Sequence, residues 1–348
     1  MSIKAGNITA GLDVGGAHLK VALAHGGRVV AAEQFVCPLW QGLDRLDAAL
    51  AAARPLTTKA QLVGITMTGE LSDVFENRRQ GVETLVRRLS EEFGTDTRFW
   101  IGPNGFGSAM DAVANHALVG STNFLATAAL VGRQISDALV VDFGSTTTDI
   151  VPVLAGAPSP RGLTDAKRQA TGELVYTGYT RTAVMGIAQR APMDGQWVTL
   201  AREYLATMAD VRRILGADLA EVDLHATADG KGKTQPESLT RFARMLGRDA
   251  SDAPTAAWLI AAGFVQQEQM RSIEDGVRLV LSAHHMPAGA PIVAAGIGAE
   301  AIDLMARALG RPWMTFGALV AAQPDVARKA TWSAPAAALA VLLASVTK

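Results

Sequence analysis

The chain is poor in cysteine and in aromatic residues. Cys37 is the only cysteine among 348 residues, so neither an intrachain disulfide nor a thiolate zinc cluster can form. Aromatic residues make up 5% of the sequence, and no basic run is interleaved with them in the way that nucleic-acid binding needs. We therefore expect a reducing compartment and no nucleic-acid partner.

An excess of charge of one sign and long apolar runs are also lacking. Lys and Arg total 32 against 33 Asp and Glu, so an anionic ligand must be met by a local site. No basic segment followed by a long apolar stretch opens the sequence, and the apolar segment 334–346 is shorter than the ~20 residues that span a bilayer. We expect a cytoplasmic protein without a membrane partner, and the sequence leaves its oligomeric state open.

Short apolar strands separated by glycine turns are present in two places. Residues 8–13, 21–24 and 28–35 predict a three-stranded meander, and residues 139–153 predict a second strand pair. Helical spacing is found at 43–53, 108–132, 198–215 and 256–283. The repeat predicts a duplicated α/β fold with a cleft between the halves, which we place at 1–135 and 136–348, with a polar insertion near 155–182.

An aspartate ends the first strand of each pair. Asp13 lies in LDVGG and Asp142 lies in VDFGS. A buried carboxylate is unfavourable unless it is paired or holds a metal, and the adjacent glycines let backbone N–H groups converge on an anion. One such turn alone would indicate an ordinary hairpin, because Asp and Gly are common turn residues. Two matching turns favour a site for a diphosphate or triphosphate with Mg²⁺.

The phosphate site draws on both turns and on a later glycine motif, GIG. Phosphate contacts are assigned to Gly15, Gly16, His18, Gly144, Ser145, Thr146, Thr147, Thr148, Gly296 and Gly298. Metal contacts are assigned to Asp13, Asp142 and Asp149, with Mg²⁺ as the expected cofactor. Two alternatives stay open: a place on the hairpin surface for His18, and a role in holding the hairpin instead of a metal for Asp149.

These motifs resemble the actin, Hsp70 and sugar-kinase superfamily, in which duplicated actin-like, ribonuclease H-like domains share a phosphate cleft. The segments GELVYTGYTRT and TADGK with RFARMLGRD resemble the hydantoinase/oxoprolinase-related family linked to tetrahydromethanopterin-dependent one-carbon metabolism. The resemblance implies a transferase of methanofuran or methylofuran biosynthesis. Such an enzyme joins an aminomethyl-furan-methyl diphosphate to the phenol of γ-glutamyltyramine, or a tyrosine-derived equivalent, and releases pyrophosphate.

That reaction needs a proton acceptor for the phenol and contacts for two small-molecule substrates. Catalytic roles are assigned to Glu70, Glu173, Lys20 and Asp142. Substrate contacts are assigned to Asn104, Asn123, Tyr176 and Arg181. For Glu70 the alternative is capping of a helix start, for the two asparagines it is turn capping, and for the tyrosine segment it is packing against the core.

Two other functions stay open. The superfamily usually binds nucleotide, so an ATP-dependent kinase or an ATP-driven amidohydrolase is the main alternative, with adenosine beside the segment 296–298. A non-enzymatic nucleotide-binding scaffold of the actin type is the third hypothesis.

Overall fold

The computed structural model describes residues 8–346, and its first sheet grows from the N-terminal meander. Strands β1 (Thr9–Val14), β2 (His18–His25) and β3 (Arg28–Val36) pair antiparallel through their glycine turns. On its other side, β1 pairs in parallel with β4 (Leu62–Met67). The strands β5 (Arg98–Trp100) and β6 (Phe106–Gly107) complete the sheet, whose order is β3-β2-β1-β4-β5-β6. All six residues of β1 are buried, as expected of a central strand covered on both faces.

The second sheet repeats this plan. β7 (Ala138–Phe143) pairs antiparallel with β8 (Thr148–Leu154) and in parallel with β13 (Ile292–Ala295), which pairs with β14 (Trp313–Thr315). β9 (Ala157–Pro158) and β10 (Leu174–Val175) add to the far side of β8. Two mixed sheets with the same strand-pair core confirm the expected duplicated α/β fold.

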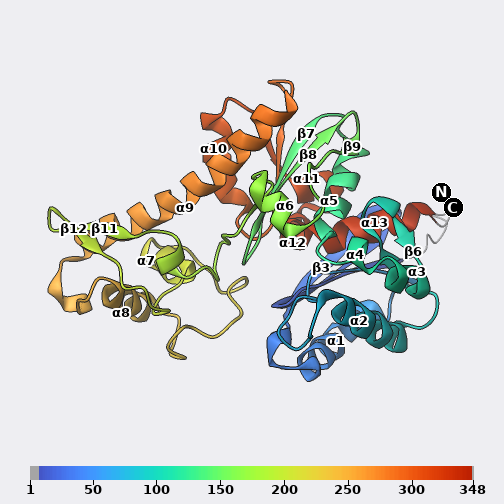
Figure 1. Ribbon diagram of the computed structural model, residues 1–348, viewed down its shortest axis with the longest axis horizontal. Helices are drawn as coiled ribbons and strands as arrows, with labels where there is room; N and C mark the ends of the chain where they lie inside the picture. The colour runs from blue at the N-terminus through green and yellow to red at the C-terminus, as the bar shows by residue number, and fades with distance from the viewer. Residues whose placement is uncertain (1–7, 347–348) are drawn as a thin grey trace.

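Most of the helices lie beside these sheets, whereas α7 and α8 lie apart from them (Figure 1). They are α1 (Leu43–Thr57), α2 (Arg78–Phe93), α3 (Ala109–Ala114), α4 (His116–Val119), α5 (Asn123–Gly132), α6 (Asp165–Ala170), α7 (Met208–Ile214), α8 (Gln235–Met245), α9 (Thr255–His284), α10 (Ile302–Ala308), α11 (Phe316–Val320), α12 (Pro324–Trp332) and α13 (Ala334–Val346). The helix predicted at 256–283 is confirmed. The one predicted at 198–215 is largely wrong, because 196–199 form a strand and the capping box of Thr207 with Asp210 starts the helix only at Met208.

A side lobe, residues 184–265, has a hydrophobic core of its own. It contains the hairpin of β11 (Arg190–Met193) and β12 (Gln196–Thr199), together with α7, α8 and the first part of α9. Figure 1 shows α9 running from this lobe to the second sheet. The segment 155–182, in which a polar insertion is expected, contains β9, α6 and β10 beside that sheet.

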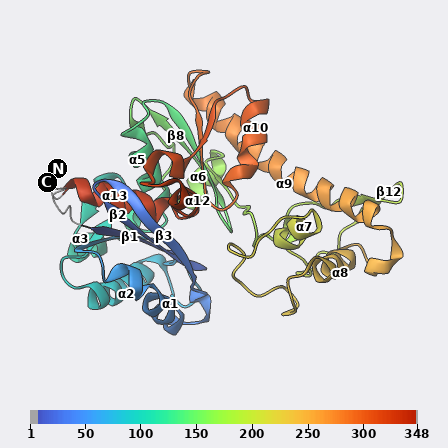
Figure 2. The same ribbon diagram turned by 180° about the vertical axis from the view of Figure 1, so that it is seen from behind.

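The last helix, α13, packs against the first sheet although it follows the second sheet in the chain (Figure 2). A Cβ on Gly11 in β1 would overlap the carbonyl oxygen of Ala336, so the strand and the helix touch backbone to backbone. Thr9 Oγ1 donates to the Ala340 carbonyl at 2.6 Å. Within residues 8–346, no helix combines the length and the apolar character needed to cross a bilayer.

Candidate functional site

The two strand pairs end in turns of the same geometry. In the first turn the Gly15 N–H donates to the His18 carbonyl at 2.9 Å, and in the second the Gly144 N–H donates to the Thr147 carbonyl at 2.9 Å. The register matches too, since Asp13 lies opposite Lys20 and Asp142 lies opposite Asp149. The duplication visible in the sequence is therefore a duplication of hairpin geometry.

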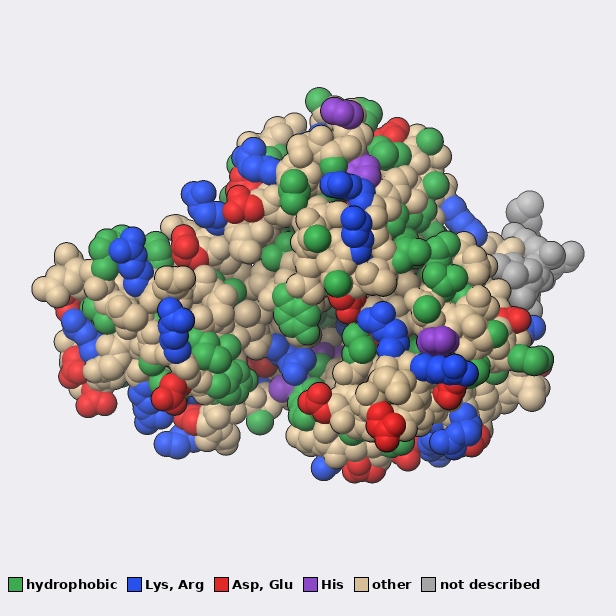
Figure 3. Space-filling view, in the orientation of Figure 1, with side chains coloured by type: hydrophobic (Ala, Val, Ile, Leu, Met, Phe, Trp, Pro, Cys, Tyr) green, Lys and Arg blue, Asp and Glu red, His purple; other side chains and the backbone are tan. Residues whose placement is uncertain are grey.

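Both hairpins face one cleft of about 320 Å³ between the halves of the molecule. Figure 3 shows a hollow near the middle of the molecule, with basic and histidine side chains beside it. The cleft is lined by these predicted site residues: Asp13, Gly15, Gly16, His18, Lys20, Asn123, Asp142, Gly144, Ser145, Thr146, Thr147, Asp149, Tyr176 and Arg181. At Gly16 a Cβ would meet nothing within 4 Å, so the first turn presents open backbone.

Asp13 has two polar neighbours on the floor of the cleft. Its Oδ2 lies 3.6 Å from Lys20 Nζ, and its carboxylate forms a hydrogen bond with the Asn123 side chain. Burial raises the pKa of Asp13, while Lys20 and Asn123 oppose that rise. Its Oδ1 is buried without a hydrogen-bond partner, so one oxygen of this carboxylate remains to bind a ligand.

Asp142 and Asp149 have different surroundings although they lie opposite each other. Burial raises the pKa of Asp142 to about 7; Asp149 and Asp13 add to the rise, and Lys20 opposes it. Asp149 Oδ1 instead accepts a hydrogen bond from Arg168 Nη1 at 2.7 Å. Asp142 therefore changes charge near neutral pH, whereas Asp149 is held in an ion pair.

The second turn is supported by the segment 177–182. A Cβ on Gly178 would overlap the carbonyl oxygen of Ser145, so this glycine lets the segment pass directly beneath the turn. Arg181 donates through its backbone N–H to Ser145 O and through Nη1 to Thr146 Oγ1, both at 2.9 Å. Thr148 is turned away from the cleft, because its hydroxyl donates to the buried carbonyl of Thr177.

Aromatic side chains form the rim of the cleft on the side of the first turn. Trp40 is held there by the backbone around it, since the Leu39 N–H donates to Gly16 O at 3.0 Å. The His225 ring, from the side lobe, lies 4.6 Å from the His18 ring and 5.6 Å from the Trp40 ring, centroid to centroid. The Arg181 guanidinium lies 5.0 Å from the Trp40 ring centroid.

Two predicted catalytic acids do not line the cleft. Glu70 is fully buried behind Ser121, whose hydroxyl donates to Glu70 Oε1 at 2.8 Å, and Arg78 Nε lies 3.6 Å from that oxygen. Burial raises the pKa of Glu70. Glu173 is also fully buried, and its Oε1 accepts from the Arg161 N–H at 2.6 Å.

Three other predicted residues also lie outside the lining. Asn104 is exposed at the end of a short 3-10 helix, Gly102–Asn104. The Gly298 N–H donates to Phe143 O at 2.9 Å, and a Cβ there would lie 2.8 Å from the Tyr179 ring. Gly296 packs against the backbone of Phe143 and the side chain of Asp142. These glycines therefore support the second strand pair from behind.

Several lining residues were missed by the sequence analysis: Trp40, Thr68, Ser72, Ser121, Asp165 and Arg168. His225, which contacts two of the lining rings, was also missed. Arg168 and Asp165 carried a weak signal, because they lie in the segment beside GELVYTGYTR. His225 carried none, since it is separated by about two hundred residues from the turn it contacts.

The donor set of the cleft suits a cation bound together with an anion. Four carboxylates, Asp13, Asp142, Asp149 and Asp165, line it against three basic side chains, Lys20, Arg168 and Arg181. A diphosphate would meet excess negative charge unless a divalent cation bound with it. Within the described residues no cluster of three or more His, Cys, Asp or Glu side chains is arranged to hold a metal. Mg²⁺ would suit this site, since it often takes one or two carboxylates with phosphate and water.

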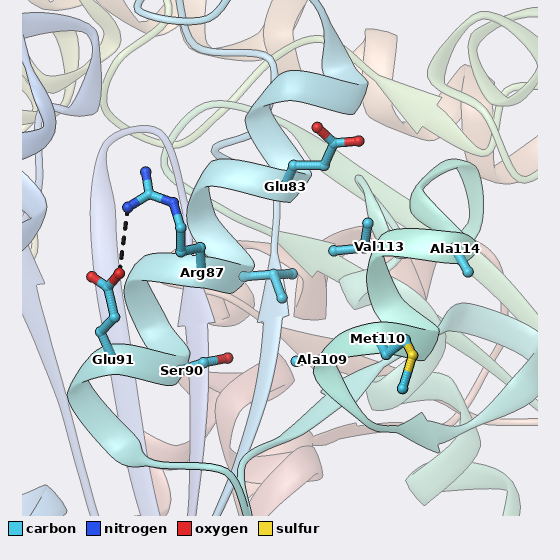
Figure 4. Close-up of a pocket in the computed structure, with 9 residues that line it drawn as sticks. Glu83, Arg87, Ser90, Glu91, Ala109, Met110, Val113 and Ala114 are labelled. Atoms are coloured by element: carbon cyan, nitrogen blue, oxygen red, sulfur yellow. Dashed lines mark hydrogen bonds and ion pairs between the residues drawn. The ribbon is translucent and has the colours of Figure 1, made fainter.

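A second hollow, of about 640 Å³, lies between α2 and α3 (Figure 4). Its charged residues pair along α2: Arg87 Nη1 lies 3.4 Å from Glu91 Oε1, and Arg79 pairs with Glu83 at 2.8 Å. Across from them lie Met110 and Val113. Polar groups do not converge here as they do between the hairpins, so the candidate site is the cleft.

Comparisons with known proteins bear on the fold and the family. The profile of the hydantoinase/oxoprolinase family matches residues 61–343. The (4-{4-[2-(γ-L-glutamylamino)ethyl]phenoxymethyl}furan-2-yl)methanamine synthase of Methanocaldococcus jannaschii is 28% identical over 291 residues, which are 83% of this chain and 86% of that protein. The synthase of the same name from Methanococcus vannielii is 32% identical over 112 residues, which are 32% of this chain and 50% of that protein. A nucleotide-free acetone carboxylase structure has a TM-score of 0.55 at 11% identity and covers 95% of this chain and 70% of its own.

Proposed function

Because the chain belongs to the hydantoinase/oxoprolinase family, we propose that it is a transferase that moves a furfuryl group from a diphosphate ester to a phenol oxygen. The donor is an aminomethyl-furan-methyl diphosphate, the acceptor is γ-glutamyltyramine or a tyrosine-derived equivalent, and pyrophosphate is released. The synthases at 28% and 32% identity are named for the furfuryl aryl ether that this reaction forms. The reaction would belong to methanofuran or methylofuran biosynthesis.

The observation that carries the proposal is the matched pair of hairpins around one cleft. Asp13 and Asp142 lie next to the ends of equivalent strands, and Ser145, Thr146 and Thr147 add hydroxyl side chains beside the second turn. Such a cleft can hold two linked phosphate groups with their counter-ion.

The chemistry asks mainly for stabilisation of the leaving group. A furfuryl carbon ionises readily because the furan ring spreads the positive charge, so the enzyme mainly has to stabilise the negative charge that develops on pyrophosphate. Lys20 and Arg181 would bind its oxygens, together with the Thr146 hydroxyl. Asp13 and Asp142 would hold Mg²⁺, which neutralises part of the charge of the bound diphosphate.

The contacts around residues 296–298 favour this proposal over ATP chemistry. The alternative places adenosine beside residues 296–298. A Cβ on Gly298 would meet the Tyr179 ring at 2.8 Å, and its N–H is used by the Phe143 carbonyl. Leu219 and Val222 of the side lobe pack with Tyr179 and Ile297 in the same region. These contacts place side chains of the protein beside residues 296–298, which supports a transferase over an ATP-dependent enzyme.

The test compares two sets of substrates. Purified protein with Mg²⁺ receives either the furfuryl diphosphate with γ-glutamyltyramine or ATP with γ-glutamyltyramine, and pyrophosphate, phosphate and the ether are measured. The proposal expects pyrophosphate and an equal amount of ether from the first pair. Turnover of ATP without ether formation would identify an ATP-driven enzyme instead, and ATP-dependent polymer formation without turnover would identify a scaffold.

A matched pair of variants links that activity to the cleft. Asp142→Asn removes a carboxylate of the cleft and is expected to lower ether formation at least about 100-fold. Asp275→Asn makes the same change at an exposed position on α9 and should leave the rate unchanged. Equal rates in the two variants would remove Asp142 from the mechanism.

A further inference from the structure

His18 places a buried ring nitrogen without a partner in the wall of the cleft. The side chain is 5% exposed, lines the cleft, and its Nε2 has no hydrogen-bond partner. A buried polar atom without a partner is unfavourable, so such an atom facing a ligand cleft indicates a group that the ligand satisfies. From the sequence, His18 is expected at the phosphates, but its ring also contacts the aromatic rim.

The carboxylates that could otherwise accept a proton are paired with basic side chains, lie outside the lining or are proposed to bind the cation. Asp149 pairs with Arg168 at 2.7 Å, Asp165 lies 3.6 Å from Arg78 Nη2, and Lys20 lies 3.6 Å from Asp13. Glu70 and Glu173 are buried outside the lining. Asp13 and Asp142 are the carboxylates proposed to meet the cation. His18 is therefore the lining side chain that is left to receive a proton.

We infer that His18 Nε2 accepts the phenol proton while the acceptor ring lies against Trp40. This inference rests on the proposed function. The carbon–oxygen bond to diphosphate breaks and its electron pair stays on pyrophosphate. A lone pair of the phenol oxygen forms the new ether bond to the furfuryl carbon, and the phenol proton passes to His18 Nε2. Atoms and charges balance without any further reactant.

The surroundings of His18 keep the ring able to accept a proton. Burial lowers its pKa well below the usual value, and the nearby His225, Lys20 and Arg181 act in the same direction. A weak base suffices here, because a phenol oxygen that is bonding to a furfuryl cation becomes far more acidic than free phenol.

His225 acts as a positioning residue. Its ring meets His18 edge-on, with an interplanar angle of 74°, and lies tilted by 35° on Trp40. Through these contacts the side lobe meets both the proposed base and the aromatic rim. This contact gives the lobe a role in the reaction as well as in the fold.

The test separates ether formation from loss of pyrophosphate. His18→Gln should lower ether formation at least about 100-fold, the usual scale of general base catalysis. Without acceptor, the same variant should release pyrophosphate from the furfuryl diphosphate at the wild-type rate, because departure of the leaving group needs no base. A ring-fluorinated, more acidic acceptor should raise ether formation by the variant several-fold more than by the wild type. Equal ether formation by variant and wild type would overturn the inference.

Two more variants serve as a control and as a second test of the inference. His285→Asn, at an exposed position with φ 47° that asparagine tolerates, should behave as the wild type. If His18→Gln loses both activities, the inference is tested with His225→Asn, which leaves His18 in place. This variant should raise the KM for the acceptor without changing pyrophosphate release. An unchanged KM and unchanged ether formation in that variant would count against the inference. If the wild type forms no ether at all, the proposed function fails, which is a different outcome from an inactive His18.

Discussion

Arg168 Nη1 donates to Asp149 Oδ1 at 2.7 Å, so a carboxylate that the sequence assigns to a metal is held by a buried arginine. Arg168 is 2% exposed and also donates through Nη2 to Glu173 O at 2.9 Å. Removing one partner leaves the other charge uncompensated, which costs more than the pair contributes. Arg168→Met should therefore lower the free energy of unfolding by about 3 kcal/mol, as measured by urea denaturation.

The double variant Arg168→Met with Asp149→Asn distinguishes the ion pair from simple loss of packing. It should be more stable than Arg168→Met alone, since the uncompensated carboxylate is gone. Equal stability of the single and double variants would show that Arg168 acts through its contact with the Phe124 ring, 3.6 Å from its guanidinium carbon.

Asp142 makes the stability of the metal-free protein depend on pH. Its pKa rises from 3.8 to about 7 on folding, mainly through burial. Between those values the folded chain binds a proton that the unfolded chain does not, so stability falls as pH rises through this window. Asp142→Asn should therefore be more stable than the wild type by up to a few kcal/mol at about pH 8, and similar at about pH 4.

Thermal unfolding in a chelator across this pH range checks that prediction, with Asp275→Asn as the control that should follow the wild type. Added Mg²⁺ should raise the melting temperature of the wild type most at the alkaline end, where Asp142 is ionised. A wild-type stability that rises between about pH 4 and 7 in parallel with Asp142→Asn would contradict the raised pKa.

Gly178 tests the support beneath the second turn. Gly178→Ala would place a methyl group on the Ser145 carbonyl and push the turn toward the cleft. We expect pyrophosphate binding to weaken at least about tenfold, measured by calorimetry with Mg²⁺. Gly186→Ala is the control, because a Cβ there meets nothing within 4 Å; weaker binding in both variants would point to a general loss of stability.

Gly11 tests the contact between β1 and α13. Gly11→Ala would overlap the Ala336 carbonyl and should lower the free energy of unfolding by about 1–3 kcal/mol. Gly263→Ala, in α9 with open space around the new Cβ, should raise it by about 0.5–1 kcal/mol. Both free energies are measured by chemical denaturation. If Gly11→Ala has the same free energy of unfolding as the wild type, the helix shifts freely along the strand.

Local sequence patterns predicted the parts of the fold that depend on neighbouring residues. The meander and the strand pair at 139–153 follow from alternating apolar runs and glycine turns. The helix expected at 198–215 failed because its apolar residues serve a small core shared with the β11–β12 hairpin. Tertiary packing there outweighed helical spacing.

The candidate site divides in the same way. Asp13 and Asp142 were found because each turn is a continuous segment, and the side that Lys20 faces became clear only from its pairing opposite Asp13. Trp40, Arg168 and His225 reach the cleft from distant segments, and a single sequence holds no trace of those contacts. Glu70 was misplaced because the chain turns inward after β4 and buries it behind Ser121.

The backbone contact between β1 and α13 also bears on how the protein assembles during synthesis. The first strands leave the ribosome more than three hundred residues before the helix that covers them. Until that helix arrives, one apolar face of the N-terminal sheet stays open to solvent and to other chains. The first glycine turn, at the end of β1, thus gains its final support only after residues 334–346 have been made. A nascent chain would hold no working half of the site, and chaperone binding should concentrate on this sheet.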